Sequence, residues 1–348
     1  MRGSSCSKRP WRNLGTELTP LSRRLTERVN KSLKRVVLWV GAGVVLGVIA
    51  TTGYQALSSH LSLRNNPPPG RLVELNGRKV HVLCAGEGAP TVILEAGLPG
   101  SSLTWMSVFS EIAELTRVCT YDRPGYGWSQ PTGSSRTAET IAQELRMLLQ
   151  SSDIEPPYIL TGHSFGGLVM QLYATRFPNH FMGMVLVDSS HPDQAHRTLG
   201  LREIDTISFA MKILGPIGIV RMLVPVPAGN PESRDISVRE QERELLMTNR
   251  TLRTATREMS GLRESLRQVA ESTVDLGSKP LVVLSQGQRR AQSWMAMQED
   301  LSRLSTNSEW QVVGGAGHFI QHDRPDAIVE AVRQVLERLE TTADNSPP

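Results

Sequence analysis

The sequence predicts an α/β protein with a mostly parallel sheet that is covered by helices on both faces. Short apolar runs at 91–94, 158–161 and 184–187 alternate with longer segments of helical periodicity. Strands that are apolar at every position are buried on both faces, which is typical of parallel sheets between helix layers. The 348 residues suffice for one large domain of this class with an insertion, or for two modest domains.

The elements of the body follow a stiff, polar segment, Asn65-Asn-Pro-Pro-Pro-Gly70, which is the clearest boundary in the chain. Alternating apolar residues on both sides of Asn76-Gly77 predict a β-hairpin over 71–83. Later strands are expected at 91–94, 117–121, 158–161 and 184–187. Helices are expected at 104–115 and 137–151, and a third helix follows the turn after the 158–161 strand and ends at about residue 177.

The alternation breaks after residue 193. From there to residue 277 no segment reads convincingly as a strand, and the strand pattern resumes at 280–284 and 310–313. A long helical insertion inside a sheet domain usually covers the site. We therefore expect an α/β domain at 71–340 with a helical cap over about 192–277, followed by a disordered tail at 341–348.

The N-terminal region differs from the body in charge. Residues 1–64 carry 11 Lys and Arg against 2 Asp and Glu, whereas the whole chain has a net charge of only +4. The basic charge therefore belongs to a tail, and the body is mildly acidic. This argues against a nucleic-acid partner for the body.

Residues 36–57 are predicted to form a transmembrane helix between a basic tail at 1–35 and a Pro-rich linker at 58–70. No charged residue occurs from Val36 to Leu63, and about 20 such residues span a bilayer core as a helix. The preceding basic residues place the N-terminus in the cytoplasm and the body in the periplasm or outside the cell, as a signal-anchor would. A cleaved signal peptide and a buried helix of the body are the alternatives.

The three cysteines, Cys6, Cys84 and Cys119, have no metal-binding spacing. Cys84 and Cys119 lie in predicted strands and are most simply small core residues. In an exported body these two could instead form a disulfide.

A G-x-S-x-G motif, Gly162-His-Ser164-Phe-Gly166, joins a predicted strand to a predicted helix. So sharp a turn holds its serine in a strained backbone conformation, and a Cβ at either glycine would collide with neighbouring backbone. The turn exposes the hydroxyl to a base and to a substrate carbonyl. Ser164 is therefore the predicted nucleophile, and a glycine-rich turn with a solvated serine is the alternative.

An acyl-transfer serine needs a general base and donors for the oxyanion. Of the eight histidines, His318 alone follows a late strand in a glycine-rich setting, so it is the predicted base. His163 is expected to pack beside the turn, because its position next to Ser164 points it away from the hydroxyl. The backbone N–H groups of Phe165 and Leu98 are the expected oxyanion donors, unless the loop that contains Leu98 is a plain turn.

These motifs resemble those of the α/β-hydrolase superfamily, in the branch with an esterase-like core and a helical cap. The resemblance is carried by Gly97-Leu-Pro-Gly100, by Tyr121-Asp-Arg-Pro-Gly-Tyr-Gly-Trp-Ser129, by Gly162-His-Ser-Phe-Gly-Gly167 and by Gly317-His318, and it covers about residues 70–340. It implies a mostly parallel eight-stranded sheet. The motifs are specific for the fold, less specific for hydrolysis, and say little about the substrate.

The position of the catalytic acid departs from the common pattern of the superfamily. The strand that usually precedes the acid runs here into Ser285-Gln-Gly-Gln-Arg-Arg290, which contains no Asp or Glu. The superfamily also places the acid after the preceding strand, and there Asp188 is the predicted acid. Asp193 is its rival, and Asp188 could also simply cap the following turn.

The resemblance implies a two-step mechanism that requires no metal or organic cofactor. Ser164 attacks an ester or related acyl carbonyl, His318 takes its proton, and Asp188 steadies the imidazolium. The apolar stretch Ile207–Val226 suggests a small acyl or aromatic substrate, or a membrane contact, although core packing of the cap would also explain it. A serine nucleophile argues against haloalkane and epoxide hydrolysis. Peptidase, thioesterase, carbon–carbon hydrolase and perhydrolase activities are alternatives, as is a non-catalytic binding protein; the oligomeric state is not predicted.

Overall fold

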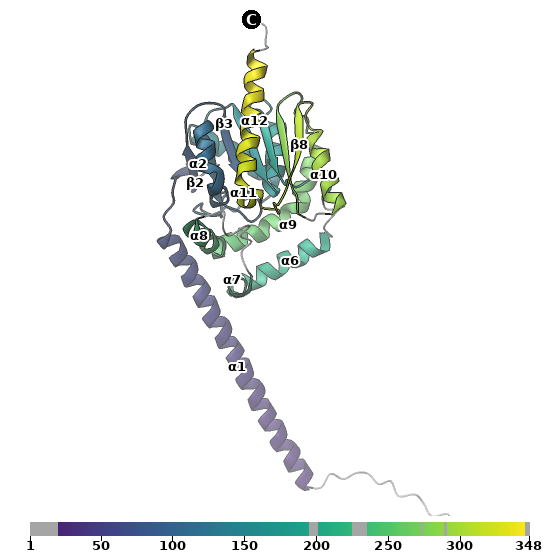
Figure 1. Ribbon diagram of the computed structural model, residues 1–348. Helices are drawn as coiled ribbons and strands as arrows, with labels where there is room; N and C mark the ends of the chain where they lie inside the picture. The colour runs from purple at the N-terminus through teal and green to yellow at the C-terminus, as the bar shows by residue number, and fades with distance from the viewer. Residues whose placement is uncertain (1–19, 195–200, 225–234, 273, 289–290, 345–348) are drawn as a thin grey trace, which may run out of the picture. The chain divides into compact units, whose positions relative to one another are not determined.

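The chain divides into two compact units, residues 1–50 and residues 51–348. The computed structural model describes residues 20–194, 201–224, 235–272, 274–288 and 291–344 (Figure 1). Residues 1–19 of the predicted basic tail lie outside these ranges.

In the first unit, the described residues are helical throughout and belong to α1 (Pro20–Asn65). The side chains from Arg24 to Ala50 are exposed, and Trp39 is 77% exposed. The segment is long and apolar enough to cross a membrane, a test that a signal sequence also passes. The helix continues to Asn65 because the chain contains no proline between Pro20 and Pro67. The predicted linker at 58–70 is therefore wrong for residues 58–65, which are helical.

The second unit is built on an eight-stranded sheet in the order β1-β2-β4-β3-β5-β6-β7-β8. The strands are β1 (Arg71–Leu75), β2 (Arg78–Ala85), β3 (Thr91–Glu95), β4 (Val118–Tyr121), β5 (Tyr158–His163), β6 (Phe181–Val187), β7 (Leu281–Gln286) and β8 (Ser308–Val313). β2 pairs antiparallel with β1 and β4, and all other pairs are parallel. The predicted hairpin is present, and its turn has a positive φ at both Asn76 (50°) and Gly77 (73°), as tight hairpins favour.

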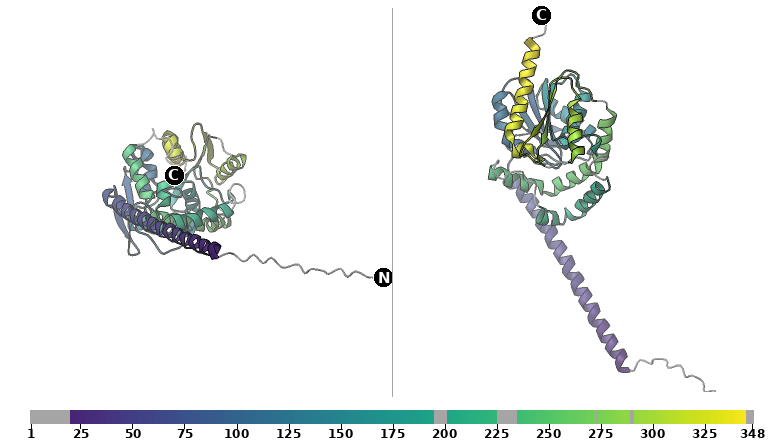
Figure 2. Two further views of the ribbon diagram at one scale, coloured as in Figure 1. Left: turned by 90° about the horizontal axis from the view of Figure 1, so that it is seen from below. Right: turned by 45° about the vertical axis from the view of Figure 1, so that its right-hand side comes forward.

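Helices cover both faces of the sheet, as predicted. One face carries α2 (Met106–Leu115) and α12 (Pro325–Asp344), and the other carries α3 (Ala138–Ser151), α4 (Phe165–Arg176) and α10 (Gln292–Ser302). Figure 2 shows α12 and α10 on opposite sides of the sheet. Successive strand residues point to opposite faces, so that Val282 packs into one core cluster and Val283 into the other. Because α12 continues to Asp344, the predicted disordered tail is wrong for residues 341–344.

Four described helices form the cap, and Figure 1 shows them gathered at one end of the sheet. They are α6 (Leu201–Leu214), α7 (Ile219–Leu223), α8 (Ile236–Leu246) and α9 (Asn249–Glu271). The described residues of the predicted cap contain no strand. α9 is amphipathic, and its buried face contacts α3, α4 and α6.

The last turns of α1 belong to the second unit, where they pack against the cap. The buried Gln55 donates from Nε2 to the carbonyl of Met247 at 2.8 Å, and Arg221 donates from Nε to Gln55 Oε1 at 2.9 Å. The N–H of Asn249 donates to Ser59 Oγ at 3.1 Å. The folded body therefore starts before the predicted boundary at residue 71.

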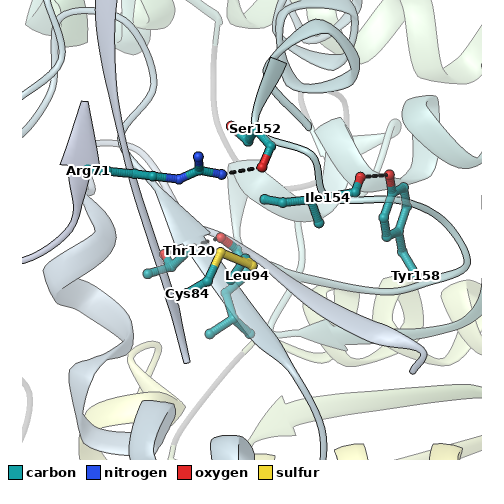
Figure 3. The surroundings of a disulfide bond; sticks show 8 residues. Arg71, Cys84, Leu94, Thr120, Ser152, Ile154 and Tyr158 are labelled. Carbon is teal, nitrogen blue, oxygen red and sulfur yellow. Dashed lines mark hydrogen bonds between the residues drawn. A yellow bond between two sulfur atoms is a disulfide. The ribbon is translucent and has the colours of Figure 1, made fainter. Parts of the chain in front are cut away.

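Cys84 and Cys119 form a disulfide between the antiparallel strands β2 and β4. The two residues are direct partners in the strand register, with their Cα atoms 4.1 Å apart. Figure 3 shows the bond beside Leu94 and Thr120, and it also shows Arg71 donating to the carbonyl of Ser152. The pairing that the sequence left open is therefore made in the structure.

Removing the disulfide should destabilise the body. The double variant Cys84→Ala/Cys119→Ala loses a crosslink over a separation of 35 residues, so its free energy of unfolding in urea should fall by about 2–4 kcal/mol. Cys6→Ala is the matched control and should unfold like the wild type. Three alkylatable thiols in unreduced, denatured protein from its native compartment would contradict the disulfide.

Candidate active site

Ser164 is the single residue between the end of β5 and the start of α4, and its backbone angles are φ 52° and ψ −121°. A Cβ on Gly162 would lie 2.7 Å from the carbonyl oxygen of Gly166, and a Cβ on Gly166 would lie 2.5 Å from that of Glu95. The glycines are therefore sterically required, as the motif predicts. A non-glycine residue in such a conformation costs on the order of 1–3 kcal/mol, which the packed strand and helix must offset.

The structure brings Ser164, His318 and Asp188 together. Nε2 of His318 lies 3.0 Å from Ser164 Oγ, and Nδ1 lies 2.6 Å from Asp188 Oδ2. The carboxylate can only accept, so Nδ1 carries the proton and Nε2 is free to accept from the serine hydroxyl. Asp193 does not take this position; its N–H donates to Nδ1 of His191 at 3.1 Å.

The Asp188 carboxylate is fully buried and held by several donors besides His318. Trp294 Nε1 donates to Oδ1 at 2.9 Å, and Gln286 Nε2 donates to Oδ2 at 2.7 Å. Gln286 ends β7, where superfamily members commonly carry the acid. The end of β7 here supplies a donor to the carboxylate of Asp188, which directly follows β6. No sequence motif predicts that Trp294 and Gln286 hold Asp188, and the absence of an acid after β7 is the available signal.

His163 packs beside the turn, as expected, and contacts the backbone of His318. Its Nε2 lies 2.9 Å from the carbonyl oxygen of His318, and its Nδ1 lies 3.3 Å from the Gln321 side-chain nitrogen. Burial, and then the neighbouring His318, hold the pKa of His163 well below its ordinary value. The ring is therefore neutral, donates from Nε2, and fixes the segment that carries His318.

The two expected oxyanion donors belong to segments that flank Ser164. Phe165 is the first residue of α4, so its N–H has no acceptor within the helix. The loop that contains Leu98 lies against the serine, because a Cβ on Gly97 would be 3.2 Å from Ser164 Cβ.

A buried cluster of charges lies beside the loop that contains Leu98. Arg123 is 2% exposed and forms ion pairs with Glu95 at 2.6 Å and with Glu258 of α9 at 3.0 Å. Burial raises the pKa of Glu95, against the lowering effect of the Arg123 charge. No motif in the sequence predicts that Glu95 and Glu258 pair with Arg123.

Asp122 stabilises the loop that follows β4. Its carboxylate accepts from the N–H groups of Ser102 at 2.7 Å and Trp128 at 2.9 Å. Across the described ranges, no group of three or more His, Cys, Asp or Glu side chains is arranged to hold a metal ion.

A family model and a curated relative each match part of this chain. Residues 90–202 match the family model described as alpha/beta hydrolase fold. The uncharacterized protein YqjL of Bacillus subtilis is 27% identical over 255 residues, which cover 72% of this chain and 85% of YqjL.

Solved structures share the fold. An esterase from Thermogutta terrifontis aligns with a TM-score of 0.61 at 20% identity, over 78% of this chain and 99% of the esterase. The epoxide hydrolase CorEH aligns with a TM-score of 0.62 at 20% identity, over 77% of this chain and 98% of CorEH. The family model and these structures show that the chain has the α/β-hydrolase fold.

Asp188 and Asp193 can be separated by mutation. Asp188→Asn should lower kcat on a p-nitrophenyl ester by roughly 10³–10⁴-fold, because an amide at Nδ1 favours the wrong imidazole tautomer. Asp193→Asn is the matched control and should change kcat by less than about threefold, a change of under about 1 kcal/mol in the barrier. A larger loss with Asp193→Asn would move the acid to that residue.

Proposed function

We propose that this chain is a serine hydrolase that cleaves a carboxylic ester or a related acyl bond through an acyl-enzyme intermediate. The observation that supports this most strongly is the continuous series from Ser164 Oγ through His318 to Asp188, with separations of 3.0 and 2.6 Å. These groups come from the ends of β5, β8 and β6. A hydroxyl, an imidazole and a buried carboxylate in this order form the arrangement that activates a serine.

In the acylation step, Ser164 Oγ bonds to the substrate carbonyl carbon while His318 Nε2 takes the hydroxyl proton. The carbonyl π electrons move to the oxygen, which accepts hydrogen bonds from the N–H groups of Leu98 and Phe165. His318 then returns its proton to the leaving alcohol as the bond between carbonyl carbon and alcohol oxygen breaks. Water repeats the sequence on the acyl-enzyme and releases the acid.

Apolar side chains that the cap leaves exposed support an apolar acyl substrate. Packing of the cap's own core does not account for them. Phe209 of α6 is 65% exposed and Leu223 of α7 is 74% exposed, so these side chains do not serve the interior of the domain. Ile207 and Ile213 of α6 and Met222 of α7 are exposed as well, and a contiguous exposed apolar patch often marks a surface that binds a substrate, a partner or a membrane.

We also infer that the protein is anchored by residues 36–57, with the N-terminus in the cytoplasm and the body in the periplasm or outside the cell. The exposed apolar helix and the basic residues before it support this topology. The disulfide supports it independently, because disulfides persist mainly in oxidising compartments.

The hydrolase function is tested by the variant Ser164→Ala. A fluorophosphonate probe should label the wild type at one residue and leave Ser164→Ala unlabelled. Turnover of a panel of p-nitrophenyl esters should fall at least ~10³-fold. Ser134→Ala, at an exposed serine in the loop before α3, is the control and should retain both labelling and turnover.

A wild-type chain that neither reacts with the probe nor hydrolyses any ester of the panel would support a non-catalytic binding protein instead. Labelling without ester turnover would point to a peptidase, thioesterase or carbon–carbon hydrolase with the same triad.

A further inference from the structure

We propose that Arg123 and the cap residue Glu258 are positioning residues that orient the Leu98 N–H toward the oxyanion. This role rests on the proposed serine-hydrolase function, because an oxyanion forms only if Ser164 attacks a carbonyl. The role ties the cap to the chemical step itself, in addition to any role in covering the substrate.

Arg123 uses every donor that it has. Its Nε donates to Glu258 Oε1 at 3.2 Å. Nη1 donates to Glu95 Oε1 and to the carbonyl of Ala96, both at 2.6 Å. Nη2 donates to the carbonyl of Gly97 at 2.8 Å and to Glu258 Oε2 at 3.0 Å. A guanidinium has five N–H groups in a rigid planar fork. Because all of them are engaged, the group cannot turn without breaking a buried hydrogen bond.

The carbonyl of Gly97 and the N–H of Leu98 belong to one peptide group. This peptide is not among the cis bonds of the described chain, so it is planar and trans, with its C=O and N–H pointing in opposite directions. The hydrogen bond from Arg123 draws the carbonyl toward the buried cation and thereby turns the Leu98 N–H away from it. The positive charge also polarises the peptide, which makes this N–H a stronger donor.

The same cation contacts the other expected donor residue. The Arg123 guanidinium carbon lies 5.7 Å from the centre of the Phe165 ring, within the range of a cation–π interaction. One side chain therefore touches the segments on both sides of Ser164 that would supply the oxyanion donors.

Glu258 brings the cap into this arrangement. It is fully buried on α9, and its carboxylate also accepts from Tyr126 Oη at 2.9 Å and from Arg136 Nη2 at 3.2 Å. A buried guanidinium must be paired, because removing one partner leaves an uncompensated charge. The cap thus supplies one of the two carboxylates that hold Arg123. Even esters too small to touch the cap should depend on Glu258.

The test is the variant Glu258→Gln, which keeps the side-chain volume and removes the charge. On p-nitrophenyl acetate, kcat should fall about tenfold or more, since loss of a whole oxyanion donor costs about 10²–10³-fold. KM should stay within about twofold, because the ground-state ester does not use the donor. Affinity for a boronate transition-state analogue should fall by the same factor as kcat/KM. Glu264→Gln, at a partly exposed glutamate of α9 that pairs with Arg267, is the matched control and should change none of these.

A second variant, Tyr126→Phe, removes a single hydrogen bond to Glu258 and leaves every charge in place. It should lower kcat in the same direction by a smaller factor and keep KM. Active sites are counted by fluorophosphonate titration in each sample, so that kcat refers to folded, reactive enzyme only.

The outcomes separate the two proposals. A wild type that does not react with the fluorophosphonate would remove the hydrolase function. The positioning role would be overturned if Glu258→Gln titrates normally with the fluorophosphonate and its kcat is unchanged. If Glu258→Gln does not fold, the same result in Tyr126→Phe would overturn it. A rise in KM alone, with boronate affinity unchanged, would overturn it as well, because Glu258 would then act in substrate binding.

Discussion

The positive-φ turn at Ser164 is the constraint on which the rest of the site depends. β5 lies between β3 and β6 in a parallel sheet, and the register pairs Gly162 with Glu95 and His163 with Val187. The carboxyl ends of the three strands therefore meet beside the turn, as ligand sites of open α/β sheets do. One neighbour continues into the Gly97 loop and the other into Asp188. The sheet order thus places the Ser164 hydroxyl, the loop that contains Leu98 and the Asp188 carboxylate at the same edge of the sheet.

Buried charge connects this sheet edge to the cap. Arg123 follows β4, Glu95 ends β3, and Glu258 comes from α9, and all three are essentially excluded from water. Charges in such surroundings are tolerated because each is paired and hydrogen-bonded. Arg123 therefore joins α9 of the cap and the Gly97–Leu98 peptide in one network of hydrogen bonds.

The sequence allowed prediction of the features that depend on local pattern. The strands, the Asn76-Gly77 hairpin and the turn at Ser164 each have a short-range cause, and the missing acid after β7 directed attention to Asp188. Glu258 was not foreseen because 135 positions separate it from Arg123 and nothing in a charged amphipathic helix marks one glutamate as buried. The end of α1 was misjudged because the helix runs on until a proline stops it.

The most direct measurement of the central claim is a crystal structure of the chain after reaction with a fluorophosphonate. The account predicts phosphorus bonded to Ser164 Oγ, with the phosphoryl oxygen about 2.7–3.1 Å from the backbone nitrogens of both Leu98 and Phe165. An adduct on another residue, or a phosphoryl oxygen that faces away from these two N–H groups, would contradict it.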